Sequence, residues 1–160
     1  MDPKALHLVI RFSDSMFNVG DVVSKHNEIV DVHGLVWFGK LGGTLALSRI
    51  ELLNKQISQG IPTFIYLVKG NRRKSTPYKA NIYVISRDLP KKEKAFIPPY
   101  YTKKKLLKYM NAWIKIGHIE QVEMSSMKKL KTINSILPIE ETLVRSSSGY
   151  FLVHESNSIF

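Results

Sequence analysis

Hydrophobic residues in the first part of the chain change from strand spacing to helix spacing and back. Large hydrophobic side chains occupy every second position of LHLVIRF (6–12), which predicts a β-strand. In residues 18–34 they recur at intervals of three and four positions, and the pattern stops at Gly34, which predicts a helix. The apolar run of residues 35–38 then predicts a second strand.

The next part of the chain predicts a helix followed by a hairpin. Residues 48–59 begin with SRIE, which fits a capping box, and Gly60 and Pro62 follow as helix terminators. The β-branched and aromatic runs of residues 63–69 and 79–86 predict two strands. The polar, basic sequence GNRRKSTP joins them, so we expect a hairpin with a long, positively charged loop.

The second half of the chain is less regular. Residues 87–101 contain three prolines and predict an irregular loop. We expect a helix over residues 102–111 and a strand over 112–122. A short helix over 125–134 and a closing strand over 149–155 complete the pattern. The chain of 160 residues therefore predicts one α+β domain with about six strands and three or four helices.

Positive charge is concentrated in one segment. Residues 69–108 hold thirteen lysine or arginine residues against Asp88 and Glu93, so their net charge of +11 equals that of the whole chain. Such a localised charge is expected of a protein that binds a phosphate backbone. The alternative is a solvated surface kept for solubility, and for the hairpin tip an ordinary solvated turn is equally consistent. The basic residues expected to bind phosphates are Lys69, Arg72, Arg73, Lys74, Lys91, Lys92, Lys94, Lys103, Lys104 and Lys105.

Several classes of chemistry find no support in the sequence. The chain has no cysteine, which excludes disulfides, thiol nucleophiles and thiolate metal sites. Its five histidines lack metal-ligand spacing, GKLGGT lacks the residue order of a phosphate-binding loop, and its acidic pairs are of a common surface type. No signal peptide or membrane span is evident. We therefore expect a cytoplasmic protein without catalytic residues, metal or cofactor, and with no membrane partner.

The stretch LVWFGKLGG (35–43) presents the main ambiguity. Trp37 is either an ordinary core residue or the wall of a pocket at the rim of a sheet, and the glycines that follow it favour the rim. Trp113 has no such glycines beside it and is expected in the core. Asp14 and its neighbouring serines are open to a simpler interpretation as helix caps.

The order of elements and a few motifs resemble the PUA-like superfamily, and within it the EVE and YTH domains. LVIRFSDSMFN and GLVWFGK are similar to the family segments that hold a polar motif and the first tryptophan of an aromatic cage. The resemblance implies a twisted, six-stranded, barrel-like sheet flanked by helices, with a pocket for a methylated base. The second wall corresponds to AFIPPYY. The implied base pocket comprises Trp37, Phe38, Phe96, Tyr100, Tyr101, Ser13, Asp14 and Asn18.

The chain departs from the family at two of these places. A YTH domain usually has asparagine where Asp14 stands, and a carboxylate accepts hydrogen bonds without donating them, so a different base or base edge is expected. Residues 87–101 contain no tryptophan, so a cage built from Trp37 and tyrosines would have another shape.

VWFGK, IPTFIYL and the basic hairpin loop resemble most the N-terminal domains of archaeal McrB-type proteins. Those proteins fuse a PUA-like reader to a GTP-driven AAA+ motor and, with a partner nuclease, cut modified DNA. The resemblance implies a non-catalytic recognition module at the N-terminus of a longer protein, which reads a methylated DNA base extruded from the duplex. An RNA-binding PUA or ASCH-type module remains the alternative, and a small nuclease would require a clustered acidic metal site.

Overall fold

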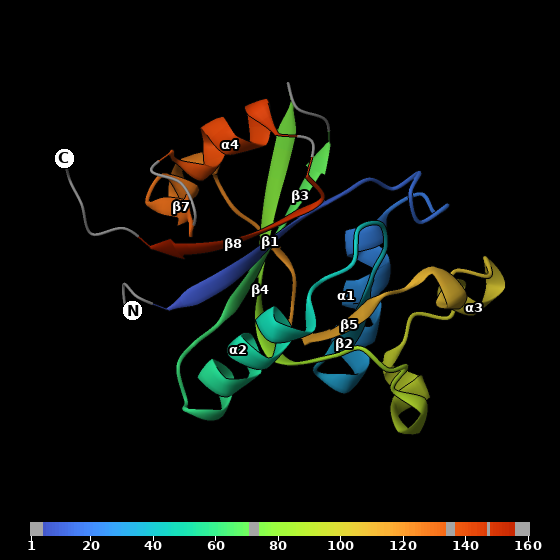
Figure 1. Ribbon diagram of the computed structural model, residues 1–160. Helices are drawn as coiled ribbons and strands as arrows, with labels where there is room; N and C mark the ends of the chain where they lie inside the picture. Colours follow the sequence, from blue (N-terminus) through green and yellow to red (C-terminus); the bar gives the residue numbers. More distant parts are fainter. Residues whose placement is uncertain (1–4, 71–73, 134–136, 147, 156–160) are drawn as a thin grey trace.

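Eight strands form one mixed sheet in the computed structural model, which describes residues 5–70, 74–133, 137–146 and 148–155 (Figure 1). The strand order is β2-β5-β4-β3-β1-β8-β7, and β6 pairs with β4 beside this path. Only β1 and β3 run parallel among the described strand pairs. The strands are β1 (Leu6–Phe12), β2 (Val36–Lys40), β3 (Phe64–Gly70), β4 (Ser75–Ser86), β5 (Ala112–Ile116), β6 (Glu120–Gln121), β7 (Leu130–Thr132) and β8 (Tyr150–Glu155).

The sheet is curved but not closed. Strand β4 pairs with β3 along its first part and with β5 along its second, and its register shifts between Ile82 and Val84. Such a bulge bends a strand and increases its twist. The described path starts at β2 and ends at β7, which do not pair. The predicted α+β class is therefore confirmed, and the curved sheet has eight strands where six were expected.

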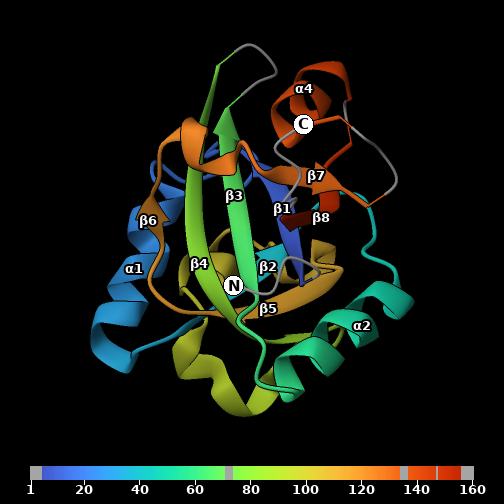
Figure 2. The ribbon, with the colours of Figure 1, turned by 90° about the vertical axis from the view of Figure 1, so that its left-hand side faces the viewer.

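Helices cover both ends of this sheet (Figures 1 and 2). Helix α1 packs on β2 and α2 on β4 and β1, whereas α4 lies over β7 at the opposite end. None of the helices in the described part of the chain has the length and apolar composition needed to cross a membrane. The helices are α1 (Val22–His33), α2 (Leu47–Ser58), α3 (Tyr100–Lys103) and α4 (Ile139–Arg145), with 3-10 turns η1 (Lys91–Phe96), η2 (Leu107–Tyr109) and η3 (Met124–Met127).

Two of the predicted elements follow local signals closely. Strand β1 has the predicted bounds, and α1 ends where Gly34 adopts a left-handed φ of 84° and donates its N–H to the Val30 carbonyl. Helix α2 begins at Leu47, one residue before its predicted start, but its N-cap is Ala46 with no side-chain hydrogen bond. The predicted capping box is therefore wrong, because Ser48 lies inside the first turn.

The predictions for residues 102–111 and 125–134 are largely wrong. The first segment holds the end of α3 and the turn η2, separated by Lys105 at a φ of 57°, which no right-handed helix accommodates. The second holds η3 and then β7, which pairs with β8. Helix α4 was not predicted, and α3 with η1 occupies part of the expected irregular loop.

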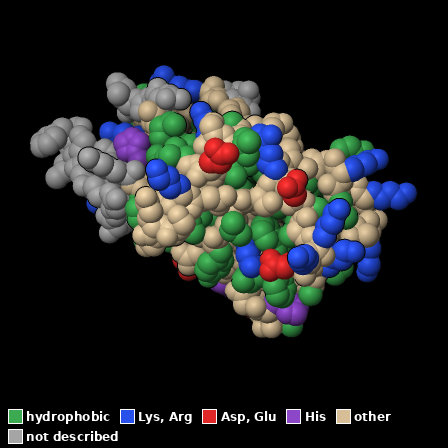
Figure 3. Space-filling view, turned by 60° about the horizontal axis from the view of Figure 1, so that its bottom comes forward, with side chains coloured by type: hydrophobic (Ala, Val, Ile, Leu, Met, Phe, Trp, Pro, Cys, Tyr) green, Lys and Arg blue, Asp and Glu red, His purple; other side chains and the backbone are tan. Residues whose placement is uncertain are grey.

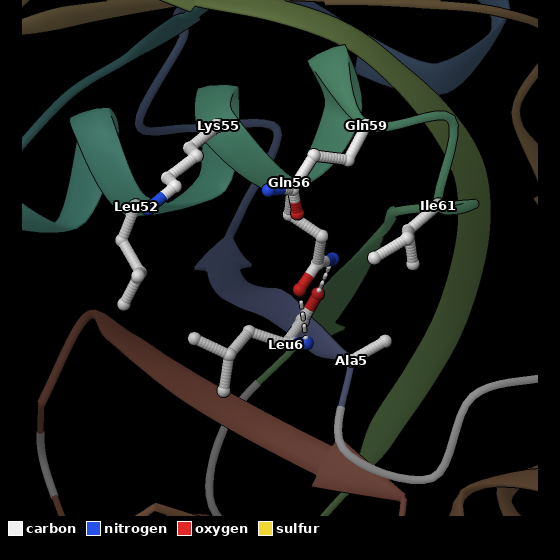
Figure 4. Close-up of a pocket in the computed structure, with 7 residues that line it drawn as sticks. All are labelled: Ala5, Leu6, Leu52, Lys55, Gln56, Gln59 and Ile61. Carbon is white, nitrogen blue, oxygen red and sulfur yellow. Dashed lines mark hydrogen bonds between the residues drawn. The ribbon is translucent and has the colours of Figure 1, made fainter.

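Gln56 attaches α2 to the first strand (Figure 4). Its side-chain oxygen accepts the Leu6 N–H at 2.7 Å, and its side-chain nitrogen donates to the Leu6 carbonyl at 2.8 Å. The same nitrogen donates to Thr63 Oγ1 at 2.7 Å. These bonds satisfy both backbone groups at the beginning of β1 and fix the position of α2 against the sheet.

Candidate nucleic-acid interface

Seven exposed lysines lie on the segment between β4 and β5. In Figure 3, blue side chains gather at the right-hand end of the molecule, the end where α3 lies in Figure 1. Among the described residues, the ion pairs within 4 Å do not include any of these seven. We call this set the lysine face, and it consists of Lys91, Lys92, Lys94, Lys103, Lys104, Lys105 and Lys108.

The acidic residue within η1, Glu93, is bound by groups of the sheet and not by the lysine face. Glu93 accepts a hydrogen bond from Trp37 Nε1 at 3.0 Å and pairs with Lys115 Nζ at 3.1 Å. Its negative charge is therefore balanced by a lysine of β5 and a donor of β2. Trp37 is 4 % exposed, so its indole is a buried group that holds η1 against β2.

The polar motif after β1 forms a compact turn. Asp14 Oδ1 accepts the N–H of Val22, the first residue of α1, at 2.9 Å. Its other carboxylate oxygen pairs with Lys69 Nζ at 2.7 Å. Ser13 Oγ accepts the Met16 N–H at 3.2 Å. The turn thus uses the predicted site residues Ser13 and Asp14 to bind its own backbone and one predicted phosphate-binding lysine.

Asp14 is ionised at neutral pH. Partial burial alone would raise the pKa of its carboxyl group, but the hydrogen bonds from Lys69 and the Val22 amide outweigh burial and hold that pKa below its ordinary value. The hydrogen bond to Asp14 likewise raises the pKa of Lys69. Asp14 therefore acts as an acceptor for Lys69, and each of its oxygens already has a partner.

A shallow, open depression lies between this turn and the end of α3. Its lining brings together Asn18, at a left-handed φ of 53°, and Lys104 of the lysine face. Ser15, Val19 and Gly20 complete the lining. Two of the residues predicted from the sequence, one for the base edge and one for phosphate, thus lie at the same hollow.

Tyr101 is buried in the core. Its hydroxyl donates to His26 Nε2 and accepts the Gly39 N–H at 3.0 Å, while His26 Nδ1–H donates to the Val22 carbonyl at 2.7 Å. Burial lowers the pKa of His26 to about 4, so the imidazole is neutral at pH 7. Burial also raises the pKa of Tyr101 well above its ordinary value. This network joins α1, α3 and β2.

The other predicted aromatic residues also pack inside or against the core. Tyr100 is 8 % exposed and meets Tyr101 edge-on at 4.8 Å between ring centres. Phe38 is buried beside His26 at 5.1 Å, and half-buried Phe96 lies 5.0 Å from the His33 ring. The described ring pairs do not place either tyrosine opposite Trp37. Trp37 and the two tyrosines therefore do not form an open cage in this structure, and a role for these residues in base binding stays a prediction.

The hairpin stem reaches the same end of the sheet as the turn after β1. Phe12 is in register with Lys69 in the parallel β1–β3 pair, so the stem continues beside the turn. Lys74 is exposed on this stem. Arg72 and Arg73, also predicted to bind phosphates, lie outside the described residues.

A pocket of about 480 Å³ lies within the lysine face. It was not predicted from the sequence. Aliphatic and proline side chains form most of its walls, and Lys94 and Thr102 add polar groups. The feature of the sequence that could have indicated this pocket is the set of apolar residues interspersed among the lysines of residues 87–108. We call it the loop pocket, and its lining consists of Leu89, Lys94, Ile97, Pro99, Thr102 and Leu107.

The curved mixed sheet and its lysine face define an α+β domain with a surface suited to polyanions. The family model described as Pua-like matches residues 8–153, and the chain belongs to this family. PUA-like domains are in general non-catalytic binding modules, and membership indicates a module that binds nucleic acid. Neither the curated proteins nor the solved structures gave a significant match. The narrower resemblance to McrB-type proteins, with its motor and nuclease, stays a prediction.

Proposed function

We propose that this domain binds nucleic acid through the lysine face and reads a methylated DNA base extruded from the duplex. The lysine face carries the proposal, because its seven ammonium groups are exposed and, among the described residues, lie beyond 4 Å of any carboxylate. Unpaired surface ammonium groups can exchange their counterions for phosphates, which is the main source of affinity for a nucleic-acid backbone.

The neighbouring acidic groups leave this field intact. Glu93 is bound by Trp37 and Lys115, and Asp14 is paired with Lys69. Both carboxylates therefore have local cations or donors of their own. The positive potential of the lysine face extends into solvent, where it can attract a polyanion before contact.

The loop pocket is the place we propose for the extruded base. Its volume of about 480 Å³ lies within the range of small-ligand sites, and its apolar walls can replace the stacking that a base loses on leaving the duplex. Thr102 and Lys94 supply polar groups for the base edge. A methyl group adds apolar area, so such a pocket favours a methylated base over a plain one.

The phosphate part of the proposal is tested by the salt dependence of binding to a fluorescent duplex. Replacing Lys94, Lys103 and Lys104 together by glutamine should weaken binding. It should also flatten the slope of log affinity against log salt by up to about three, since each lost contact with duplex DNA is worth roughly 0.9. The control triple variant replaces exposed Lys55, Lys128 and Lys129, which lie on α2 and after η3. Equal weakening in both triple variants would show that affinity depends only on the total charge of the protein, and it would contradict the lysine face as the binding surface.

The base-reading part is tested with one sequence prepared as plain duplex, with 6-methyladenine, with 5-methylcytosine and as RNA. We expect tighter binding to one methylated duplex and a common salt slope for all DNA ligands. Thr102→Trp, which fills the loop pocket from an exposed position, should remove that preference, whereas Thr44→Trp at another exposed position should keep it. A preference for the RNA, with equal affinity for every DNA, would instead favour the RNA-binding alternative.

A further inference from the structure

Among the phenylalanine, tyrosine and tryptophan side chains of the described residues, only two are exposed. Tyr83 on β4 is 49 % exposed and Tyr109 at the end of η2 is 61 % exposed. The aromatic residues predicted for base binding are buried or half-buried by comparison. Of the two exposed tyrosines, Tyr109 is the one that follows directly on the lysine face.

Tyr109 lies among the groups that we propose for phosphate binding. The ammonium group of Lys108 is 5.1 Å from the centre of its ring. Leu107, two residues earlier, shares the lining of the loop pocket with Lys94. No other aromatic ring of the described residues is paired with Tyr109, although the domain's interior contains many ring contacts. One aromatic surface is thus accessible where the backbone of a bound strand would pass.

The turn that carries Tyr109 is anchored on both sides. The Tyr109 N–H donates to the Leu106 carbonyl at 2.9 Å, and Leu106 is buried. Immediately after it, Met110 covers Gly39, where an added Cβ would lie 2.5 Å from the Met110 sulfur. The Asn111 N–H then donates to the Lys40 carbonyl at 2.9 Å. The backbone at Tyr109 is therefore held against β2, and little ordering is needed to present the ring.

We infer that Tyr109 is a stacking platform for an unpaired nucleobase of the strand held by the lysine face. The inference rests on the proposed function and adds a second contact to it, outside the loop pocket. Every base has a π-face, so stacking on tyrosine tolerates any sequence, and neighbouring lysines hold the adjoining phosphates. The ligand class is a single strand, or the unpaired nucleotides beside an extruded base.

The test uses fluorescence anisotropy with a labelled twelve-nucleotide single strand of mixed sequence. Tyr109→Ala should bind it roughly tenfold more weakly than the wild type, which is within the usual range for loss of one base–aromatic stack. Its salt slope should not change, because no charge is removed. Tyr109→Phe should bind like the wild type, since the ring is kept. Tyr83→Ala, the matched control from the other exposed tyrosine, should also bind like the wild type.

Three affinity results would each overturn the inference. They are unchanged affinity in Tyr109→Ala, an equal loss in Tyr109→Phe, or an equal loss in Tyr83→Ala. The melting temperature of each variant is measured alongside, and a fall in Tyr109→Ala that tracks its loss of binding would also overturn the inference. If the wild type binds no nucleic acid, the proposed function fails and this inference with it. If binding depends on Lys94, Lys103 and Lys104 but not on Tyr109, only this inference fails.

Discussion

A single hydroxyl group, that of Tyr101, connects three elements of this domain. It donates to His26 of α1 and accepts the backbone N–H of Gly39 in β2, while its own residue belongs to α3. Tyr101 and its two partners are all buried, so water does not compete for these bonds. In such surroundings an unsatisfied donor or acceptor costs more than an ordinary hydrogen bond contributes.

Tyr101→Phe should therefore lower the free energy of unfolding by about 2 kcal/mol, because it leaves His26 Nε2 and the Gly39 N–H without partners. Urea unfolding followed by circular dichroism measures this difference. Tyr83→Phe removes a hydroxyl from an exposed side chain and should change stability by less than about 0.5 kcal/mol. A Tyr101→Phe variant as stable as the wild type would show that this hydrogen-bond network makes no net contribution to the free energy of unfolding.

The sequence identifies the aromatic residues around Trp37, but it does not show which side of the sheet each side chain faces. Successive side chains of a strand face opposite sides, so Trp37 lies under η1 while its neighbour Phe38 packs on His26 of α1. Trp113 was expected in the core and is 2 % exposed, which confirms that prediction. The bond from Trp37 to Glu93 joins residues 56 positions apart, and no local pattern contains it.

At the scale of elements, the attachment of α2 to β1 depends on one amide. Gln56→Ala should lower the free energy of unfolding by about 2 kcal/mol, since the Leu6 N–H and carbonyl both lose a partner in partly buried surroundings. The same unfolding assay tests it. Gln59→Ala, at an exposed residue three positions along, should be nearly neutral. If both variants are equally stable, the Gln56 contacts do not hold α2 in place.

Elements set by local signals were predictable, and those set by distant partners were not. Alternation defined β1, and a left-handed glycine defined the end of α1. In contrast, β7 has three residues and exists through its pairing with β8, and the break after α3 follows from the backbone of Lys105. The lysine face was predictable because its residues are close in sequence. The loop pocket was not, because its walls come from an irregular segment whose folding depends on contacts with β2.

At the scale of the whole molecule, two buried histidines link stability to pH. Burial lowers the pKa of His26 to about 4, and burial together with the charge of Lys79 lowers that of His7 to about 4. In the unfolded chain both have the ordinary value of 6.5. Between pH 6.5 and 4 the unfolded state therefore binds protons that the native state does not, so stability falls as the pH is lowered through this window.

Unfolding free energies measured in urea at pH 7.5, 6.5, 5.5 and 5.0 should show this fall, with about 2 kcal/mol from His26 alone by pH 5. Asp14 does not contribute there, because its lowered pKa makes its stabilising charge disappear only at more acidic pH. His26→Gln should be less stable at pH 7.5 and lose less between pH 7.5 and 5, whereas His118→Gln, at an exposed site, should behave like the wild type. A wild-type profile that is flat over this range would mean that one or both imidazoles become protonated within the folded domain, and the buried network around Tyr101 would then need another arrangement of its hydrogen bonds.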